Sequence, residues 1–504
     1  MTDYPTKKRV SKDRATERLL KKRRKQQAML SALGLLSVAV LSIIILIVIS
    51  VRSCSLDFSF RRPVKRADND PRWAQEVRAH DFDLAPWFAQ VGPENIYIAQ
   101  DTDLAEPGLD CLHINRLAAY PLTGSDPVWE TEVDEDLEEF HLCAGKLVGY
   151  RLHRADPARI CLTVYDAATG THDWDLEIPG AEDGGVVMDG QAAILGYSLP
   201  DGYRLAAYNL ETQAKAWGMR LPFDGMLSVD TSDGAVCDLG IYPYMGMVAY
   251  KRMNVAGFVA TGTGHRVREF ASTGYIHDVV LDMDDQLCYL LVTGNQYETY
   301  VVQVLPISGG NSRDVYRFET DCPPSQIIMH AQAGKLVLAY SASVPEGSGP
   351  VTQLVCFDRY SADPEITHEL EGVAGDLVSL PGLNGEFLLA VNADLVPDDA
   401  GLPRGWGELW RVRLSDRTAW EAHHFRRPIL SVAPFKEDCL VLLRGGEIYS
   451  YLALPDGVKR LRKARYPVLA MDIGDDGRHI AVFSWTERFY NYQPGQSAQV
   501  IVYE

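Results

Sequence analysis

The chain has 504 residues and a formal net charge of −19, with 46% apolar and 23% charged residues. This composition is typical of a globular protein and excludes a disordered or low-complexity chain. The charge is unevenly distributed, because residues 1–28 carry +8 and the remainder carries −27. An acidic bulk of this size excludes a nucleic-acid-binding surface there, since phosphate contacts require clustered positive charge.

A stretch of 23 uncharged residues without proline occupies 29–51. As a helix it would be about 34 Å long, enough to cross the ~30 Å hydrocarbon core of a bilayer. A cleaved signal peptide is the alternative, but its apolar region usually has only about 7–15 residues. Cys54 suggests a lipoprotein, yet Arg52 stands where a lipoprotein signal needs a small uncharged residue. We therefore expect an uncleaved transmembrane helix.

The flanking charges predict the orientation of this helix. Nine basic residues lie within 9–28 and five within 52–71, and the more basic flank usually stays in the cytoplasm. The predicted organisation is a basic cytoplasmic tail (1–28), a transmembrane helix (29–51), a linker (52–80) and an extracytoplasmic domain (81–504). The chain would then be a single-pass protein of the cell membrane, and the lack of an N-x-Ser/Thr sequon fits a bacterial source.

Beyond the linker the sequence repeats. RLAAYPL at 116–122 and RLAAYNL at 204–210 are near-duplicates, with the related LTVYDAA at 162–168 between them. The repeated tyrosines are each followed nine residues later by a tryptophan, and the pairs are Tyr120–Trp129, Tyr165–Trp174 and Tyr208–Trp217. A spacing near 44 residues is the length of one four-stranded propeller blade. The sequence therefore predicts an all-β protein, a β-propeller that follows one transmembrane helix.

The number of blades follows from counting third strands. Nine candidates lie near Tyr120, Tyr165, Tyr208, Gly257, Val304, Phe357, Val412, Tyr451 and Tyr503. The candidate near Gly257 is weak, so we expect eight blades, with seven or nine as alternatives. The final unit lacks a fourth strand because QVIVYE ends at Glu504. An N-terminal segment such as HDFDLAP (80–86) is expected to supply that strand and close the ring.

The unit at 160–178 resembles the repeat of the quinoprotein-type (PQQ-like) β-propellers, in Tyr165, Asp166, Thr169, Gly170 and Trp174. The next unit keeps Tyr208, Asn209 and Trp217 but has Gln213 in place of the glycine, and Trp420 belongs to a shortened fourth copy. Other units resemble WD40-like repeats. The resemblance implies that Tyr120, Trp129 and these aromatic and turn residues dock neighbouring blades. It points to the non-enzymatic, scaffold-forming branch, because no adjacent cysteine pair of the quinone-dependent dehydrogenases is present.

The sequence contains no strong candidate for catalysis, cofactor binding or metal binding. His423 and His424 are adjacent, so on a strand they would face opposite sides and could not share a metal ion. Nine cysteines without a zinc spacing are expected to be mostly buried free thiols, with Cys143–Cys161 the one pair considered. Nucleophile-elbow, zinc-protease and phosphate-loop motifs are absent from the sequence. We therefore predict no cofactor.

Two functions remain open at this stage. The first is a membrane-anchored binding or scaffold module for a protein or a cell-envelope glycan. The second is an envelope enzyme, a glycan hydrolase or lyase with its site at the central channel. For the first, the long connection at 397–407, with Arg404 and Trp406, is the predicted interaction loop, since arginine and tryptophan are enriched at binding hot spots.

Overall fold

A computed structural model describes residues 74, 76–82, 88–100, 112–124, 126–154, 157–221, 240–244, 246–293, 299–320, 326–332, 334–342, 349–358, 364, 366–397, 403–415, 417–453, 456–465, 468–474, 478–485 and 498–504. All of them belong to the compact unit Arg72–Glu504. These residues form strands and turns, and no helix among them is long and apolar enough to cross a membrane. The transmembrane helix predicted at 29–51 lies outside the described residues.

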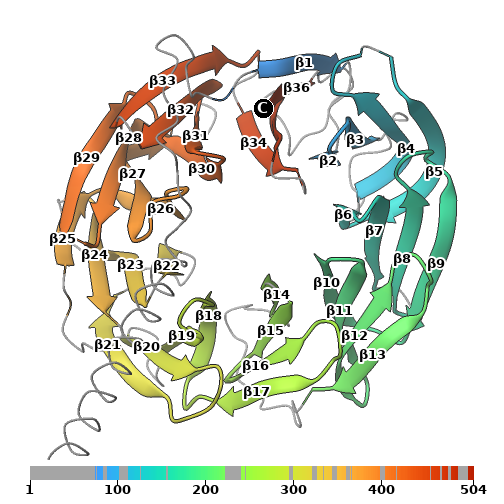
Figure 1. Cartoon of the computed structure of the whole chain (residues 1–504), viewed down its shortest axis with the longest axis horizontal. Helices are drawn as coiled ribbons and strands as arrows, with labels where there is room; N and C mark the ends of the chain where they lie inside the picture. The colour runs from blue at the N-terminus through green and yellow to red at the C-terminus, as the bar shows by residue number, and fades with distance from the viewer. Residues whose placement is uncertain are drawn as a thin grey trace, which may run out of the picture. The chain divides into compact units, whose positions relative to one another are not determined.

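Nine antiparallel sheets of four strands each are arranged around a ring in this unit (Figure 1). Each sheet is a blade, with its first strand beside the central channel and its fourth strand on the outside. The first four blades share the same chain order from inside to outside. Blade 1 comprises β2 (Phe88–Val91), β3 (Asn95–Gln100), β4 (Leu112–Pro121) and β5 (Trp129–Leu137). Blade 2 comprises β6 (Glu139–Cys143), β7 (Lys146–His153), β8 (Arg159–Asp166) and β9 (His172–Pro179). Blade 3 comprises β10 (Asp183–Asp189), β11 (Ala192–Leu199), β12 (Gly202–Asn209) and β13 (Lys215–Arg220). Blade 4 comprises β14 (Gly240–Tyr244), β15 (Met247–Arg252), β16 (Val255–Ala260) and β17 (Arg266–Ala271).

The next four blades repeat this order. Blade 5 comprises β18 (Tyr275–Asp282), β19 (Leu287–Thr293), β20 (Thr299–Pro306) and β21 (Arg313–Glu319). Blade 6 comprises β22 (Ile327–Gln332), β23 (Lys335–Ala342), β24 (Val351–Asp358) and β25 (Ile366–Glu371). Blade 7 comprises β26 (Val373–Ser379), β27 (Glu386–Pro397), β28 (Pro403–Arg413) and β29 (Thr418–Phe425). Blade 8 comprises β30 (Ile429–Phe435), β31 (Asp438–Leu443), β32 (Glu447–Ala453) and β33 (Asp456–Lys463).

Blade 9 closes the ring with strands from both ends of the unit. Its inner three strands are β34 (Val468–Ile473), β35 (Ile480–Trp485) and β36 (Ala498–Tyr503), and its outer strand is β1 (Glu76–Phe82). The register runs from Glu76 opposite Tyr503 to Phe82 opposite Ala498. The N-terminal segment thus supplies the missing strand as predicted, although the strand begins before His80. Residues 83–86 of the predicted segment lie outside the described residues.

The all-β propeller is confirmed, but the expectation of eight blades is wrong because there are nine. All nine predicted third strands are third strands, including the weak one, which is β16 in blade 4. The signal of β16 is weak because Val259 stands where Tyr165 and Tyr208 stand in blades 2 and 3. The register shift between the third and fourth strands lies directly before each of these three residues. Blade 4 therefore lacks the tyrosine that marks the third strands of blades 1 to 3.

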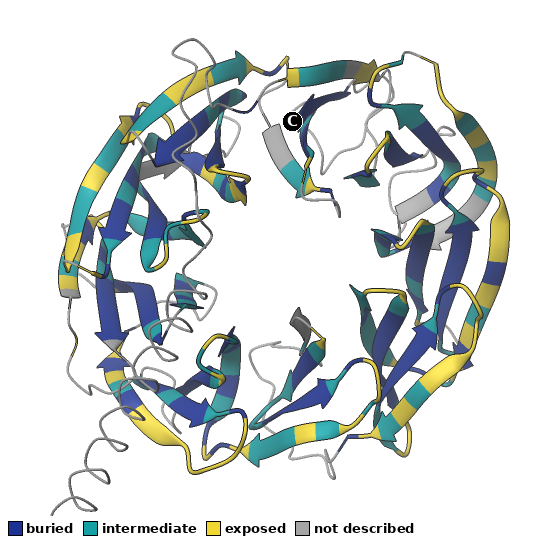
Figure 2. Ribbon diagram, in the orientation of Figure 1, coloured by how far each residue is buried: buried dark blue, intermediate teal, exposed yellow. Residues whose placement is uncertain are grey.

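The hydrophobic core lies between neighbouring blades and is built mainly by their middle strands. Both faces of a middle strand are covered, so these strands are continuous apolar runs, such as β31 and β36, in which every residue is buried. The outer strands, such as β13 and β33, alternate between half-buried and exposed positions. Figure 2 shows this as buried middle strands inside a more exposed outer wall. Side chains that reach the channel or the two faces are therefore the ones available for function.

Candidate functional site in the central channel

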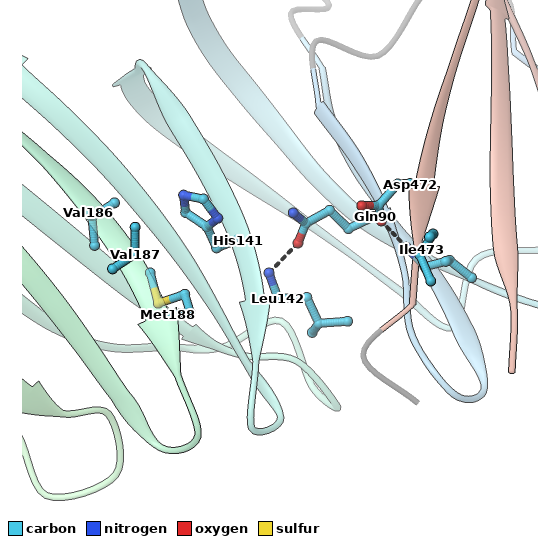
Figure 3. Close-up of a pocket in the computed structure, with 9 residues that line it drawn as sticks. Gln90, His141, Leu142, Val186, Val187, Met188, Asp472 and Ile473 are labelled. Atoms are coloured by element: carbon cyan, nitrogen blue, oxygen red, sulfur yellow. Dashed lines mark hydrogen bonds between the residues drawn. The ribbon is translucent and has the colours of Figure 1, made fainter. Parts of the chain in front are cut away.

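A cavity of about 280 Å³ lies in the channel wall where the inner strands of four successive blades meet. Its lining comes from β34, β2, β6 and β10, which belong to blades 9, 1, 2 and 3. Figure 3 shows Val186, Val187 and Met188 on one side of His141, with Gln90, Asp472 and Ile473 on the other. The cavity therefore combines an apolar wall with three polar side chains.

The polar side chains of this wall connect neighbouring blades. The Asp472 carboxylate accepts a hydrogen bond from the Val91 amide at 3.1 Å, and the Gln90 side-chain oxygen accepts one from the Leu142 amide. Asp376 in blade 7 accepts a hydrogen bond from the Val432 amide of blade 8 at 2.6 Å in the same manner. Inner-strand amides would otherwise lack a partner at the channel, so these side chains satisfy them. Their contacts are those of a framework that holds the blades in a ring.

His141 is the titratable ring at the centre of the cavity. Its Nε2 lies 2.9 Å from the Glu139 carboxylate on the same strand, which orients the imidazole along the wall. Glu139 and His141 are two residues apart, so both project from one face of β6. This pair could donate a hydrogen bond to a bound molecule or accept one from it.

A second group of ionisable side chains lies between blades 4 and 5. The Lys251 ammonium donates to the His277 carbonyl, and the His277 ring contacts the Thr293 hydroxyl at 3.0 Å. Burial and the Lys251 charge lower the pKa of His277 to about 4, so the ring is neutral at pH 7. Burial raises the pKa of Asp278 and lowers the pKa of Lys251. Three perturbed groups therefore meet near the start of β18.

A histidine and a serine also meet on the inner strands of blades 6 and 7. His330 Nε2 lies 2.5 Å from the Ser379 hydroxyl, and its ring contacts Phe387 edge-on at 5.3 Å. Burial lowers the pKa of His330, which favours the neutral imidazole. The contact joins two adjacent blades in the same way as the aspartates of the channel wall.

The tryptophans of the repeat lie at the junctions between blades. The indole N–H groups of Trp129, Trp174 and Trp217 each donate to a backbone carbonyl in the following blade. The acceptors are the carbonyl oxygens of Ala167, Leu210 and Thr261, which stand in the turn after each third strand. Trp174 is the most deeply placed of the three, at 6% exposure.

In each of these turns, one residue adopts a positive φ. Gly170 has φ +70°, and a Cβ there would lie 2.4 Å from the Trp129 ring. A Cβ at Gly264, which has φ +67°, would likewise lie too close to the Trp217 ring. Gln213 stands at the corresponding position below Trp174 and adopts φ 62° without being glycine. The departure from the repeat at Gln213 thus preserves the backbone conformation of the turn.

The acidic and amide residues of the repeat fold the same turns. The Asp166 carboxylate accepts hydrogen bonds from the Ala168 and Thr169 amides, both at 3.1 Å. Asn209 accepts from the two corresponding amides of its own turn at 3.0 and 2.8 Å. A short oxygen-bearing side chain in this place stabilises a turn by bonding the backbone two and three residues ahead.

The tyrosines and the fourth tryptophan have individual surroundings. Tyr165 and Tyr208 are buried, whereas Tyr120 is half-buried and accepts a hydrogen bond from Arg116 at 3.1 Å. Trp420 donates to the Asp456 carboxylate at 3.3 Å, and its ring lies under the guanidinium groups of Arg411 and Arg413. The junction between blades 7 and 8 therefore uses charged partners where the earlier junctions use a carbonyl.

The predicted interaction loop at 397–407 is mostly strand. Arg404 and Trp406 lie in β28, which pairs with β27 as far as Pro397 opposite Pro403. The connection is thereby reduced to 398–402, outside the described residues. The Trp406 ring lies against the His424 ring in a tilted arrangement, with 5.0 Å between centroids. These two residues are thus part of a hairpin rather than of a loop.

The cysteine pair considered from the sequence is absent from the structure. Cys143 and Cys161 are buried thiols that form no disulfide, as are Cys288, Cys356 and Cys439. Burial raises the pKa of Cys288 and Cys439, which keeps both thiols protonated and unreactive. The other four cysteines lie outside the described residues.

Sequence reasoning did not find the channel cavity or the buried groups of blades 4 to 6. Their members come from blades that are distant in the chain, as Gln90 and Asp472 show, and no local motif links them. A polar residue inside an otherwise apolar first strand was the only available signal.

No protein-family model matches this chain, and no curated protein matches it in sequence. Among solved structures, a eukaryotic initiation factor is 11% identical, with a TM-score of 0.48 over 74% of this chain and 88% of that one. The dihydro-heme d1 dehydrogenase NirN is 14% identical, with a TM-score of 0.41 over 75% of each chain. A europium-containing methanol dehydrogenase is 12% identical, with a TM-score of 0.35 over 85% and 93%. Similarity at this level concerns the fold alone and carries no argument about function.

Proposed function

We propose that the protein is a membrane-anchored, extracytoplasmic binding or scaffold module of the non-enzymatic, quinoprotein-type propeller branch. The propeller fold supports a binding or scaffold role in general. The membrane anchor is the apolar stretch 29–51, and the orientation follows from the basic residues before it. The partner is a protein or a cell-envelope glycan.

One observation carries the location of the binding surface. Strands β27 and β28 of blade 7 are the two longest described strands, with 12 and 11 residues. Their neighbours stop earlier, because β26 begins opposite Asn392 and β29 ends opposite Gly407. Residues 393–397 and 403–406 therefore extend past their own blade as a two-stranded ribbon, which we call the blade 7 ribbon.

The ribbon is suited to recognition for a physical reason. Among the described strands, none pairs with its outer edges, and strand edges of this kind are common docking sites for an extended segment of a partner. It joins a second strand to a third, and the strand order of the blades puts all ends of this kind, such as those of β23 and β24 in blade 6, on the same propeller face. Trp406 stands at the base of the ribbon with a polar indole edge. We infer that this face is the interaction surface.

The test removes the ribbon without touching its blade. Residues 394–405 are replaced by Asn-Gly, a two-residue turn that suits a hairpin and joins Ala393 to its strand partner Trp406. Folding is followed by circular dichroism and partner binding by cross-linking in living cells. We expect native folding with loss of the cross-linked partner. The matched control is Ala144→Lys in the turn between β6 and β7, which lies on the opposite face and should leave cross-linking unchanged.

The orientation is tested separately by adding protease to spheroplasts. We expect digestion of the propeller and protection of residues 1–28. A protected propeller would mean the opposite orientation, and a soluble product that begins near Ser53 or Cys54 would mean a cleaved signal.

A glycan hydrolase or lyase is the second candidate, favoured by one observation. Lys251, His277 and Asp278 lie together with perturbed pKa values, as expected of an acid–base site. The assay is release of reducing ends from purified cell-wall glycan by the full-length protein. Activity that is lost in Asp278→Asn, with folding intact, would favour the enzyme, and no release would favour the binding module.

A further inference from the structure

We propose that Glu408, Glu421 and His424, on the outer two strands of blade 7, form a binding site for a divalent transition-metal ion of the Zn²⁺ type. Each residue offers one ligand atom, and these atoms all lie within 4.8 Å of one another. The site lies outside the channel and does not depend on the proposed binding function.

The strand register brings the three side chains onto one face. Glu408 on β28 stands directly opposite His424 on β29, and Trp410 stands opposite Glu421. In a regular strand Glu421 and His424 would point to opposite sides, because they are three residues apart. The register shift next to Trp410 leaves one extra residue on β29, which turns Glu421 to the side of His424. Bulges of this kind commonly re-aim a side chain toward a functional site.

The distances fit metal coordination after small side-chain rotations. His424 Nδ1 lies 3.6 Å from Glu408 Oε1. Ligands around a tetrahedral zinc ion, at about 2.1 Å from the metal, lie about 3.4 Å from one another. The histidine and glutamate are therefore already near the required separation, and Glu421, which is exposed, is free to close on them.

Two tryptophans orient the ligands. The Trp410 indole donates to Glu408 Oε2 at 2.8 Å, which leaves Oε1 directed at the histidine. The Trp406 ring packs beside the His424 imidazole at 5.0 Å. Partners of this kind, which fix the ligand from behind, are typical of metal sites.

The ligand types select the class of ion. Two carboxylates and a neutral imidazole suit zinc and other first-row transition metals, whereas magnesium and calcium prefer oxygen ligands alone. Three protein ligands leave one coordination position for water or for a group from outside. His423 points to the other side of β29, where its ring contacts Phe425 at 4.5 Å, and it takes no part.

The experiment is a calorimetric titration of the metal-stripped full-length protein with ZnCl₂. The absorption spectrum of the Co²⁺-loaded protein is the second readout. We expect one ion per chain at this site and a Co²⁺ spectrum of nitrogen and oxygen ligands without thiolate bands. Glu421→Gln and His424→Ala should each weaken binding at least about 100-fold, since loss of an outer partner alone typically costs 10–100-fold. Trp410→Phe should weaken it about 10-fold.

His423→Ala is the matched control and should bind as the wild type does. Circular dichroism establishes that every variant folds. Wild-type protein that binds no zinc, or zinc binding that is unchanged in Glu421→Gln and His424→Ala, would overturn the proposal. Binding that is lost in His423→Ala but kept in His424→Ala would place the ion elsewhere and would equally overturn it.

Discussion

Replacing Trp174 with alanine tests the docking of neighbouring blades. The ring is 6% exposed and packs in the core that blades 2 and 3 share. Removal of a buried tryptophan typically costs about 3–5 kcal/mol of unfolding free energy. We expect the upper part of this range, because the Leu210 carbonyl would also lose the indole donor that lies 3.0 Å away.

The assay is urea denaturation of the full-length protein in detergent, with unfolding monitored by circular dichroism. Trp174→Phe separates the two contributions, since it keeps an aromatic ring but removes the N–H and should cost about 1–3 kcal/mol. Trp217→Ala is the comparison at a half-buried junction and should cost less than Trp174→Ala. A loss below about 1 kcal/mol in Trp174→Ala would refute the docking role. If Trp174→Ala kept its stability but lost partner binding, Trp174 would instead be a binding residue.

Three further predictions concern other junctions. Gly170→Ala should destabilise the protein by at least about 1 kcal/mol, because the new Cβ would meet the Trp129 ring and Gly170 has a positive φ. Gln213→Gly should be nearly neutral. Both changes are measured as shifts of the urea midpoint. Arg411→Met should cost about 2 kcal/mol in the same assay, because it removes the hydrogen bonds of a buried guanidinium to Glu386 and to the Ala453 carbonyl, although Arg413 still pairs with Glu386. Adding Glu386→Gln should recover part of the loss, and no recovery would refute the pairing. Burial raises the pKa of Asp438 to about 6, above its unfolded value of about 3.9, so its stabilising contribution is present below pH 4 and is lost as the pH rises through 6. Asp438→Asn should therefore gain roughly 2 kcal/mol relative to the wild type between pH 4 and 7, measured by thermal unfolding at each pH, and a constant difference would contradict this pKa.

Much of the propeller could be predicted because its packing repeats locally. The tyrosine of a third strand, the turn and the following tryptophan lie within one stretch of chain, as Tyr165 to Trp174 shows. The blade count could not be predicted reliably, because Val259 replaces the marker tyrosine in blade 4. Val259 is fully buried, so the strand packs in the core without the residue that identifies it in the sequence.

The functional sites were less predictable for a different reason. The channel cavity joins Gln90 to Asp472, which only ring closure brings together. The sequence placed His423 and His424 on opposite sides of a strand, and in the structure the neighbours of His424 are Glu408 and Glu421. Finding them requires the register of β28 and β29 and the position of one extra residue. Neither can be read from residue spacing.

The central claim is that a tethered propeller recognises its partner through the face that carries the blade 7 ribbon. The most direct measurement is site-specific photo-cross-linking in living cells, with the photoreactive residue placed at Val396 in the ribbon or at Gly190 in a turn on the opposite face. We predict a defined cross-linked partner from Val396 and none from Gly190. The same partner from Gly190 alone, or no partner from Val396 in a folded protein, would contradict the claim.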